Sequence, residues 1–332
     1  MPTPTPSAIA DFWVCIPARR GSTRLPDKPL ADLCGWPMVL WVASVALQSG
    51  AHRVIVATDD QEIFDTVSRA AEGDGLPPAD AGALRAAFAS APASRPAVAP
   101  AAVAPAAVAP AITPARLEVM LTAPDHPTGT DRLAEVARQA RATDDQIIVN
   151  LQGDEPLMPP QLVAGVALQL ASDPEAAVAT AACPIQEAHE VFSPHVVKLV
   201  CDKKGRALYF SRAPIPFWRD GWSAATAEER IAALSKAMAS PDSGSDPGDS
   251  SASPFFRHLG LYAYRAGALR AYSQWAPCPL EEIEKLEQLR WLYYGQPITV
   301  RWLTEAPPGG VDTLEDLARV REVLSLRTRQ SL

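Results

Sequence analysis

The chain has 332 residues, of which 48% are hydrophobic, so it can bury a sizeable core and is not disordered throughout. Its 38 acidic residues outnumber its 30 basic residues and give a net charge of −8. Such a surface does not generally attract nucleic acid or anionic lipid, so any phosphate binding must come from a local basic cluster.

Short β-rich runs alternate with amphipathic helical runs along the chain. This alternation predicts an α/β protein with a mainly parallel twisted sheet and flanking helices. Strands are expected at Phe12–Ile16, Arg53–Thr58, Leu117–Leu121 and Gln146–Leu151, with helices near residues 37–50, 60–71 and 130–141. Further along, we expect a hairpin turning at Asp202–Gly205 and a long helix over Leu280–Tyr294.

Two segments interrupt this pattern. Three copies of Ala-Val-Ala-Pro-Ala fill residues 97–111, and their prolines oppose both helix and sheet, which predicts an Ala/Pro-rich insertion over 74–116. A Gly/Ser/Pro-rich stretch predicts a second insertion over 223–254, with a helix at Glu228–Met238. With residues 1–10 as a flexible tail, residues 11–330 are expected to form a single domain, because the remainder has the size of one α/β unit.

The strongest local signal is a basic loop, Pro17–Leu30, that follows the first predicted strand. It places Arg19, Arg20, Arg24 and Lys28 beside Gly21 and Ser22 in an otherwise acidic chain. Loops between a strand and a helix at the carboxyl edge of a parallel sheet often bind phosphates, because backbone N–H groups converge there. The cluster suits a triphosphate, although a solvated basic turn is the alternative. It contains neither a Walker sequence nor a GxGxxG fingerprint.

Acidic residues follow another predicted strand. Asp154 and Glu155, in the sequence NLQGDEP, would lie at the same sheet edge, where a carboxylate can hold Mg²⁺ against nucleotide phosphates. Acids at strand ends are also common turn formers or helix caps. Asp312 could likewise cap the helix that begins near Thr313. Only a fold that brings Asp312 near Asp154 would make the two a metal site.

Other polar residues are ambiguous when taken singly. Thr128 precedes a predicted helix and is suited to cap it, and Arg132 in the first turn could be a surface residue. If residues 255–265 form a strand, His258 and Tyr262 share a face with Gly260 and Tyr264, although a satisfied core histidine is the default. Arg212 could pair with a surface carboxylate, and Glu287 and Gln288 could belong to a solvated helix face.

The cysteines and the hydropathy pattern point to the cytoplasm. The five cysteines are scattered without a CxxC pair, as is typical of reduced thiols. No apolar run approaches the ~20 residues that a membrane span needs, and the N-terminal residues do not resemble a signal peptide. We therefore expect a cytoplasmic protein with no membrane or nucleic-acid partner.

Seven motifs occur in one order: PARRGSTRLPDKPL, HPTGTDRLAE, VNLQGDEP, ALYFSRAPIP, RHLGLYAYR, IEKLEQLRWL and GGVDTLEDL. Together they resemble the 3-deoxy-manno-octulosonate cytidylyltransferases, also called CMP-Kdo synthetases. The resemblance covers nearly all of the chain outside the two predicted insertions. It implies a fold like that of the nucleotide-diphospho-sugar transferases, with a small β-rich dimerisation region. It also implies transfer of CMP from CTP to Kdo for lipopolysaccharide synthesis, a requirement for Mg²⁺, and a homodimer.

The resemblance also implies roles for individual residues. Arg19 and Lys28 would meet the triphosphate, with Ser22 and Arg24 shaping its loop, and Asp154 and Asp312 would hold magnesium. The residues around the cytidine would be Thr128, Arg132 and Gln152. Those lining the sugar-acid pocket would be Arg212, His258, Tyr262, Glu287 and Gln288, with Arg212 suited to pair with the Kdo carboxylate. No general base is assigned.

Two residues depart from the family pattern. Asp27 stands where the family commonly has glycine, and its carboxylate could pair with Lys28 or Arg24, or lower nucleotide affinity. Thr128 replaces the more usual serine and keeps the hydroxyl.

Three alternatives remain at this stage. The chain could be another nucleotidyltransferase such as a CMP-sialate synthetase, or a catalytically silent nucleotide-binding regulator. The third is an interaction scaffold that uses the Pro-rich tract, although that tract has no aromatic or charged anchors.

Overall fold

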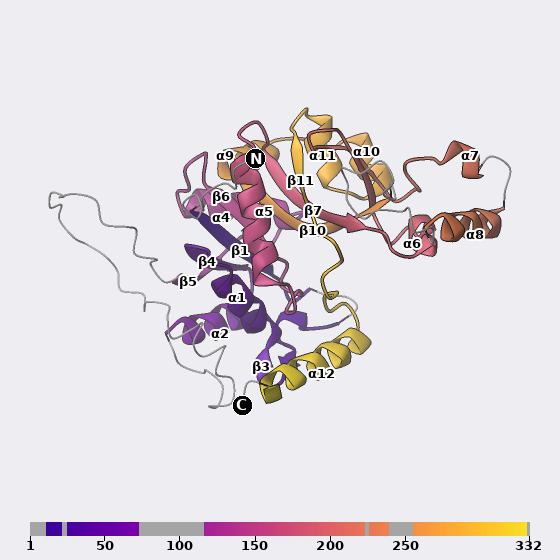
Figure 1. Ribbon diagram of the computed structural model, residues 1–332. Helices are drawn as coiled ribbons and strands as arrows, with labels where there is room; N and C mark the ends of the chain where they lie inside the picture. The colour runs from indigo at the N-terminus through magenta and orange to yellow at the C-terminus, as the bar shows by residue number, and fades with distance from the viewer. Residues whose placement is uncertain (1–10, 22–24, 73–115, 223–225, 239–254, 331–332) are drawn as a thin grey trace, which may run out of the picture. The chain divides into compact units, whose positions relative to one another are not determined.

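The computed structural model describes residues 11–21, 25–72, 116–222, 226–238 and 255–330 (Figure 1). The chain divides into two compact units, of which the second spans Gly165–Pro307 and the first contains the residues on either side of it. The predicted N-terminal tail and residues 74–115 of the first predicted insertion lie outside the described residues.

The first unit is built on a parallel sheet with the strand order β6-β1-β4-β5. In the register of β1, Cys15 lies opposite Ile55 of β4 and Asn150 of β6. The central strands are almost continuously apolar, as expected for parallel strands that are covered on both faces. The four predicted strands are confirmed as β1 (Phe12–Ala18), β4 (Arg53–Thr58), β5 (Arg116–Leu121) and β6 (Ile147–Asn150).

The helices of the first unit begin where the sequence predicts them. Asp60 caps α2 by accepting hydrogen bonds from the N–H groups of Glu62 and Ile63. The helices are α1 (Met38–Gln48), α2 (Gln61–Ala71), α4 (Gly129–Gln139) and α12 (Leu314–Gln330), while α5 (Pro160–Ser172) crosses the boundary between the units.

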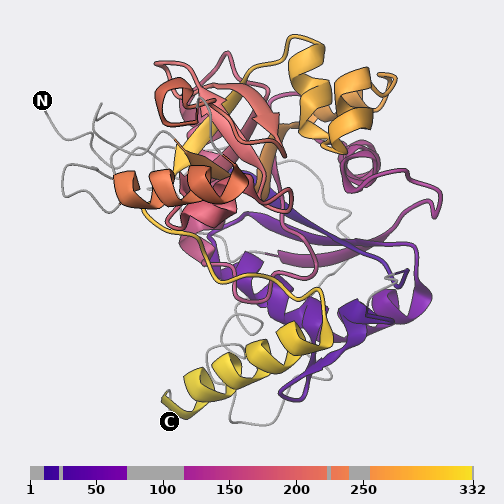
Figure 2. The ribbon, with the colours of Figure 1, turned by 90° about the vertical axis from the view of Figure 1, so that its right-hand side faces the viewer.

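A small hairpin of β2 (Asp32–Leu33) and β3 (Trp36–Pro37) contacts the C-terminal helix α12. Figure 2 shows α12 in yellow beside this indigo segment, and the Arg321 guanidinium donates to the carbonyl of Asp32 at 2.7 and 3.0 Å. One buried apolar cluster contains residues of both the hairpin and α12. Its members are Leu25, Leu33, Met38, Leu157, Val311, Leu317, Val320 and Leu324.

The second unit has mixed strand pairing. Its strands are β7 (Val178–Pro184), β8 (Lys198–Cys201), β9 (Ala207–Ser211), β10 (Phe256–Arg265) and β11 (Ile298–Trp302). Strand β7 pairs with β11 in parallel and with β10 antiparallel, and β8 pairs antiparallel with both β9 and β10. The predicted hairpin at Asp202–Gly205 is confirmed as the β8–β9 turn, with the Gly205 N–H donating to the Asp202 carbonyl at 3.0 Å. The fold is thus a mainly parallel, mixed sheet with flanking helices, as expected.

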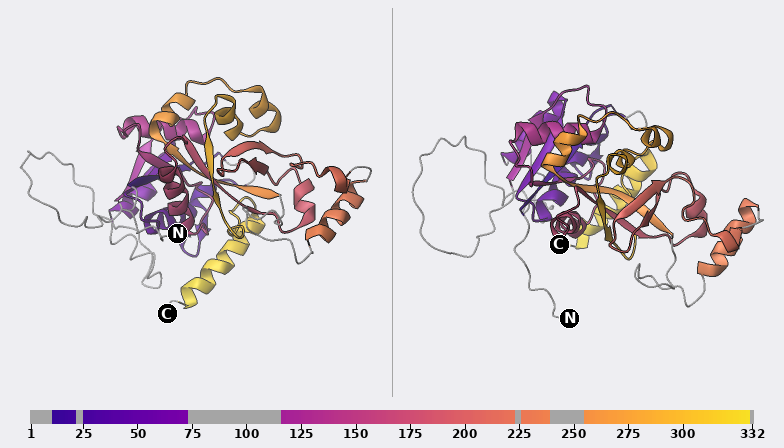
Figure 3. Two further views of the ribbon diagram at one scale, coloured as in Figure 1. Left: turned by 45° about the horizontal axis from the view of Figure 1, so that its top comes forward. Right: turned by 90° about the horizontal axis from the view of Figure 1, so that it is seen from above.

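Short helices pack at one end of the second unit. Helix α6 (Ala188–Phe192) lies side by side with α8 (Ala227–Met238) (Figure 3). Helix α7 (Arg219–Trp222) contributes Trp222, whose side chain is buried. The predicted helix at Glu228–Met238 is therefore present, and its Leu234 is buried with Trp222 in a shared apolar cluster.

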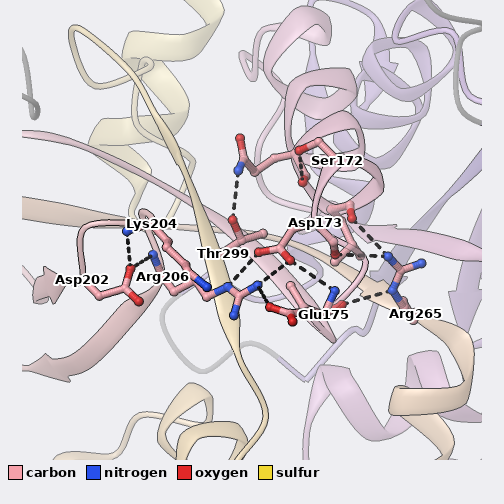
Figure 4. Close-up of polar contacts among 11 residues, drawn as sticks. Ser172, Asp173, Glu175, Asp202, Lys204, Arg206, Arg265 and Thr299 are labelled. Atoms are coloured by element: carbon pink, nitrogen blue, oxygen red, sulfur yellow. Dashed lines mark hydrogen bonds and ion pairs between the residues drawn. The ribbon is translucent and has the colours of Figure 1, made fainter.

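Two arginines connect the hairpin and β10 to the segment after α5 (Figure 4). The Arg206 guanidinium bonds to both carboxylate oxygens of Asp173 at 2.9 and 2.7 Å and to Glu175 at 2.6 Å. Arg265 donates to three backbone carbonyls, among them that of Asp173 at 3.3 Å. None of these partners is a predicted site residue, so we interpret this network as part of the scaffold of the second unit.

The expected continuous helix over Leu280–Tyr294 is wrong. The chain forms α10 (Pro279–Glu284) and α11 (Gln288–Tyr293), separated at Lys285, whose φ of 53° is left-handed. Residues nine apart lie on opposite sides of a continuous helix. The break instead brings buried Glu281 and Arg290 together in a bidentate ion pair, with distances of 2.6 and 2.5 Å. A buried ion pair of this geometry favours the interrupted conformation.

None of the helices in the described ranges combines the length and apolar character that a bilayer crossing requires.

Candidate active site

The basic loop leaves β1 at the carboxyl edge of the parallel sheet. Arg19, the first residue after the strand, donates from Nη2 to the carbonyl of His126 at 2.5 Å. This bond joins the loop after β1 to the segment before α4. Ser22 and Arg24 of the predicted phosphate loop lie outside the described residues.

Asp27 pairs with Arg20. Its carboxylate accepts from Arg20 Nε at 2.7 Å, and Glu62 accepts from another nitrogen of the same guanidinium at 2.7 Å. The hydrogen bond and charge of Arg20 lower the pKa of Asp27. Asp27 also has a φ of 53°, a left-handed conformation that glycine adopts most easily and aspartate tolerates. The backbone thus explains why a family with this turn would commonly have glycine here.

Lys28 contacts both Asp154 and Asp312, whose proximity was only a hypothesis from the sequence. Its Nζ lies 2.6 Å from Asp154 Oδ2 and 3.0 Å from Asp312 Oδ1, although the residues are far apart in sequence. Burial alone would lower the pKa of Lys28, but the bonds and charges of the two carboxylates outweigh it and raise that pKa. Lys28 is therefore a cation at neutral pH.

Asp312 does not serve as the helix cap. Thr313 takes that position at the start of α12, because its hydroxyl accepts from the Asp316 N–H at 3.2 Å. Asp316 in turn accepts from the N–H groups of Thr313 and Asp312, both at 3.1 Å. These capping bonds do not use the carboxylate of Asp312, which contacts Lys28.

Glu155 adds a third acidic group to this position. Burial, followed by the charges of Asp154 and Asp312, raises the pKa of Glu155 to about 8. Its carboxyl lies against Gly310, where an added Cβ would come within 2.9 Å of it and within 2.8 Å of the Asp154 carbonyl oxygen. The Val311 N–H donates to that same carbonyl at 2.9 Å. The glycine therefore allows the loop before α12 to approach the acidic turn closely.

The donor set matches what Mg²⁺ requires when it binds together with a nucleotide. Within the described part of the chain, no group of three or more His, Cys, Asp or Glu side chains is arranged to hold a metal ion. Mg²⁺, however, usually takes one or two protein carboxylates and completes its shell with water and phosphates. Asp154 and Asp312 supply two such carboxylates, and both already contact the cationic nitrogen of Lys28.

The three residues predicted to surround the cytidine differ in their burial and in their hydrogen-bond partners. Thr128 caps α4, and its hydroxyl also donates to Asp131 at 2.9 Å. Arg132 is fully buried, so the alternative of a surface residue is wrong, and its guanidinium bonds to Thr122 and to Asp59, the latter at 2.9 Å. Gln152 is partly exposed, and its amide donates weakly to Asn150 at 3.4 Å. Their roles toward cytidine stay predictions.

The residues predicted to line the sugar-acid pocket all belong to the second unit. Strand β10 carries His258 and Tyr262, whose rings lie 5.3 Å apart, so the expectation that they share a face is confirmed. His258 Nε2 pairs with the hydroxyl of Thr180 at 2.9 Å. Burial lowers the pKa of His258 to about 3, so the ring is neutral at pH 7. This is the satisfied histidine that the sequence left as the default.

Arg212 follows β9 and reaches the break between α10 and α11. Its Nε donates to the carbonyl of Glu284 at 2.7 Å, and Nη1 donates to that of Pro194 at 2.8 Å. Exposed Glu287 is the last residue of this break, and buried Gln288 is the first residue of α11. Arg212 therefore joins the end of β9 to the chain segment between α10 and α11.

Sequence reasoning missed Lys198 and Glu284, which contact Arg212 directly. The side chain of Lys198 is completely buried, and its Nζ donates to the Arg212 carbonyl at 2.5 Å. The Glu284 carboxylate accepts from the Arg212 N–H at 2.9 Å. A lysine within the apolar run VVKLV was a usable signal, because a charge in a buried strand needs specific partners. Glu284 carried no comparable signal among the other acids of its helix.

The first unit thus has a cationic loop after the first strand of a parallel sheet and a lysine between two carboxylates that are distant in sequence. Cations and Mg²⁺-compatible acids at this edge are what a nucleotidyltransferase requires, because an enzyme of that class must bind and neutralise a nucleoside triphosphate.

Comparison with known proteins specifies the class further. Residues 13–73 and 106–298 match the family described as cytidylyltransferase. The chain is 44% identical to a 3-deoxy-manno-octulosonate cytidylyltransferase of Aeromonas salmonicida over 95% of its length and 99% of the relative. It is 43% identical to the enzyme of that name from Polynucleobacter asymbioticus, over 95% of this chain and 96% of the relative.

A solved structure agrees with these relatives. It is described as CMP:2-keto-3-deoxy-manno-octonic acid synthetase complexed with CTP, and it is 31% identical with a TM-score of 0.68. The alignment covers 96% of this chain and all of that one. The chain belongs to the 3-deoxy-manno-octulosonate cytidylyltransferase family.

Proposed function

We propose that this protein transfers CMP from CTP to the anomeric hydroxyl of 3-deoxy-D-manno-octulosonate (Kdo), giving CMP-Kdo and pyrophosphate for lipopolysaccharide synthesis. The observation that carries the proposal is the contact of Lys28 with both Asp154 and Asp312, in a chain of this family. A protein that only bound nucleotides would have little use for two carboxylates brought together from distant segments.

The reaction sets clear requirements for the protein. The oxygen of the anomeric hydroxyl forms a bond to the α-phosphorus, the bond from that phosphorus to the bridging oxygen breaks, and pyrophosphate leaves with the electron pair. The hydroxyl proton passes to solvent, and we assign no general base. Because both substrates are anions, catalysis depends mainly on alignment and on neutralisation of charge.

Residues of the first unit supply the positive charge. Arg19 and Lys28 would bind the triphosphate, with Ser22 and Arg24 in the same loop. Asp154 and Asp312 would hold Mg²⁺, which when bound supplies charge neutralisation at the transferring phosphoryl group. Lys28 already lies between these carboxylates, so its position is fixed before substrate arrives. Thr128, Arg132 and Gln152 are the proposed residues around the cytidine.

Residues of the second unit would receive the sugar acid. Kdo carries one carboxylate, and Arg212 is the only cation in the proposed set, which otherwise consists of His258, Tyr262, Glu287 and Gln288. Burial keeps His258 neutral at pH 7, so it can contribute a hydrogen bond but no positive charge. Carboxylate binding is therefore assigned to Arg212, which can pair with it through two N–H groups.

We further infer that the enzyme acts in the cytoplasm, where CTP is made, and as a homodimer. The second unit supports self-association, because it exposes large apolar side chains, among them Leu208, Phe217, Ile283 and Tyr293. Light scattering would measure the mass in solution, and a monomeric mass at assay concentration would refute the dimer.

The decisive experiment measures pyrophosphate release with CTP and Mg²⁺ in three parallel reactions, containing Kdo, sialic acid or no acceptor. We expect rapid release with Kdo only. Preference for sialic acid would show a CMP-sialate synthetase instead. Release without an acceptor would show that the protein hydrolyses CTP, and no release with either sugar would refute the proposed function.

A further inference from the structure

Lys198 on β8 is the most completely buried lysine in the described part of the chain, and it contacts no carboxylate there through its nitrogen. Its Nζ donates to three backbone carbonyls, those of Ser193 at 2.8 Å, Val196 at 2.6 Å and Arg212 at 2.5 Å. An ammonium group has three N–H bonds, and each of them finds an acceptor here. Burial lowers the pKa of Lys198 to about 8, so the group is still mainly protonated at pH 7.

Glu284 holds the same segment from the other side. One carboxylate oxygen accepts from the Ser211 hydroxyl at 2.6 Å, and the other accepts from the backbone N–H of Arg212 at 2.9 Å. The carbonyl of Glu284 also accepts from Arg212 Nε. Arg212 is thus fixed at its N–H, its carbonyl and its guanidinium by two charged residues.

The network extends to the strand that carries His258. The His258 N–H donates at 2.8 Å to the carbonyl of Val197, which directly precedes Lys198. In the sheet register, Lys198 lies opposite Arg257 of β10 and opposite Ser211 of β9. Lys198 therefore lies between β9, which Arg212 directly follows, and β10, which carries His258.

We propose that Lys198 and Glu284 are positioning residues that hold Arg212 in the orientation required to bind the carboxylate of the sugar acid. This inference rests on the proposed function. A buried charge with fixed acceptors tolerates few arrangements, because displacement leaves a charge or a carbonyl without a partner. The guanidinium is held at Nε and at Nη1, so its orientation is set by the protein before substrate binds.

The test uses steady-state kinetics of the full chain, with Kdo and CTP varied in turn. Lys198→Met removes the ammonium and keeps an apolar chain in its place, and Glu284→Ala removes both acceptors. We expect each to raise KM for Kdo about tenfold or more, since small displacements of binding groups have large effects. KM for CTP should stay within about twofold, because the proposed CTP site is on the first unit.

Two further variants separate positioning from general damage. Glu284→Gln should recover most of the Kdo affinity, since its amide oxygen can accept from the Arg212 N–H while its NH₂ donates to Ser211. Lys203→Met removes an exposed lysine of the same hairpin and should behave like the wild type. If Lys198→Met does not fold, as judged by circular dichroism, the comparison of Glu284→Ala with Glu284→Gln decides.

The outcomes distinguish the two proposals. A wild-type protein without Kdo-dependent turnover refutes the proposed function. An active wild type in which folded variants leave KM for Kdo unchanged refutes only the positioning role. An equal rise of KM for both substrates also refutes it, because that is what a purely structural defect would produce.

Discussion

Gly310 offers a sharp test of the acidic turn. A Cβ at this position would lie 2.8 Å from the carbonyl oxygen of Asp154 and 2.9 Å from the carboxyl of Glu155. Ordinary contacts of this kind are ~3.5 Å, so Gly310→Ala must displace the loop by several tenths of an ångström. The Asp154 oxygen belongs to the backbone and cannot rotate away. We expect a loss of about 1 to 3 kcal/mol of stability, as for other overpacked sites.

The displacement should also affect catalysis. The loop carries Asp312, and its Val311 N–H bonds to the same Asp154 carbonyl. A shift approaching 1 Å at a catalytic group can reduce the rate by about a hundredfold, so we expect kcat to fall 10- to 100-fold. Gly309→Ala is the matched control, because the nearest atom to its added Cβ is Arg319 Nη2 at 3.8 Å. Pyrophosphate release and thermal melts measure both effects, and equal behaviour of the two variants would refute the reasoning.

Four other substitutions test the site. Asp154→Asn and Asp312→Asn should each reduce turnover by at least about 10²-fold with little change in circular dichroism; full activity in either would remove that carboxylate from the proposed metal site. In EDTA, the wild type should lose stability as the pH rises from 4.5 to about 8, because folded Glu155 keeps a proton that the unfolded chain releases. Glu155→Gln should remove this pH dependence. Parallel melting curves against pH would contradict this. Asp27→Gly should lower KM for CTP several-fold at low salt, because it removes a carboxylate that occupies Arg20, whereas an unchanged KM would show that Arg20 takes no part in binding.

Local patterns predicted the elements well where one face or both are continuously apolar. Phe12–Ile16 and Arg53–Thr58 belong to parallel strands that are covered on both faces, which matches their almost continuously apolar sequences. The break at Lys285 could not be predicted in this way. The residues on either side of Lys285 have helical periodicity and do form helices. The ion pair between Glu281 and Arg290, which are nine residues apart, decides the conformation between those two helices.

The same distinction applies to the candidate site, where local patterns could be predicted from the sequence and tertiary contacts could not. The basic loop and the acids after β6 are visible in sequence because they follow apolar strands. That Asp312 meets Lys28 depends on tertiary packing, and only the order of the seven motifs suggested it. Arg132 shows the limit of composition-based reasoning, since an arginine in a first helical turn is usually exposed, yet here Asp59 and Thr122 compensate its burial.

Apolar neighbours explain how three distant charged groups keep a common position. Leu25 precedes Lys28 by three residues, Leu157 follows Asp154 by three, and Val311 directly precedes Asp312, and all three apolar side chains belong to one buried cluster. Each charged segment is thus anchored by its own hydrophobic residue, and the burial of these residues offsets the cost of bringing like-charged carboxylates together. A site assembled in this way is organised before nucleotide binds, so that binding energy need not be spent on ordering it.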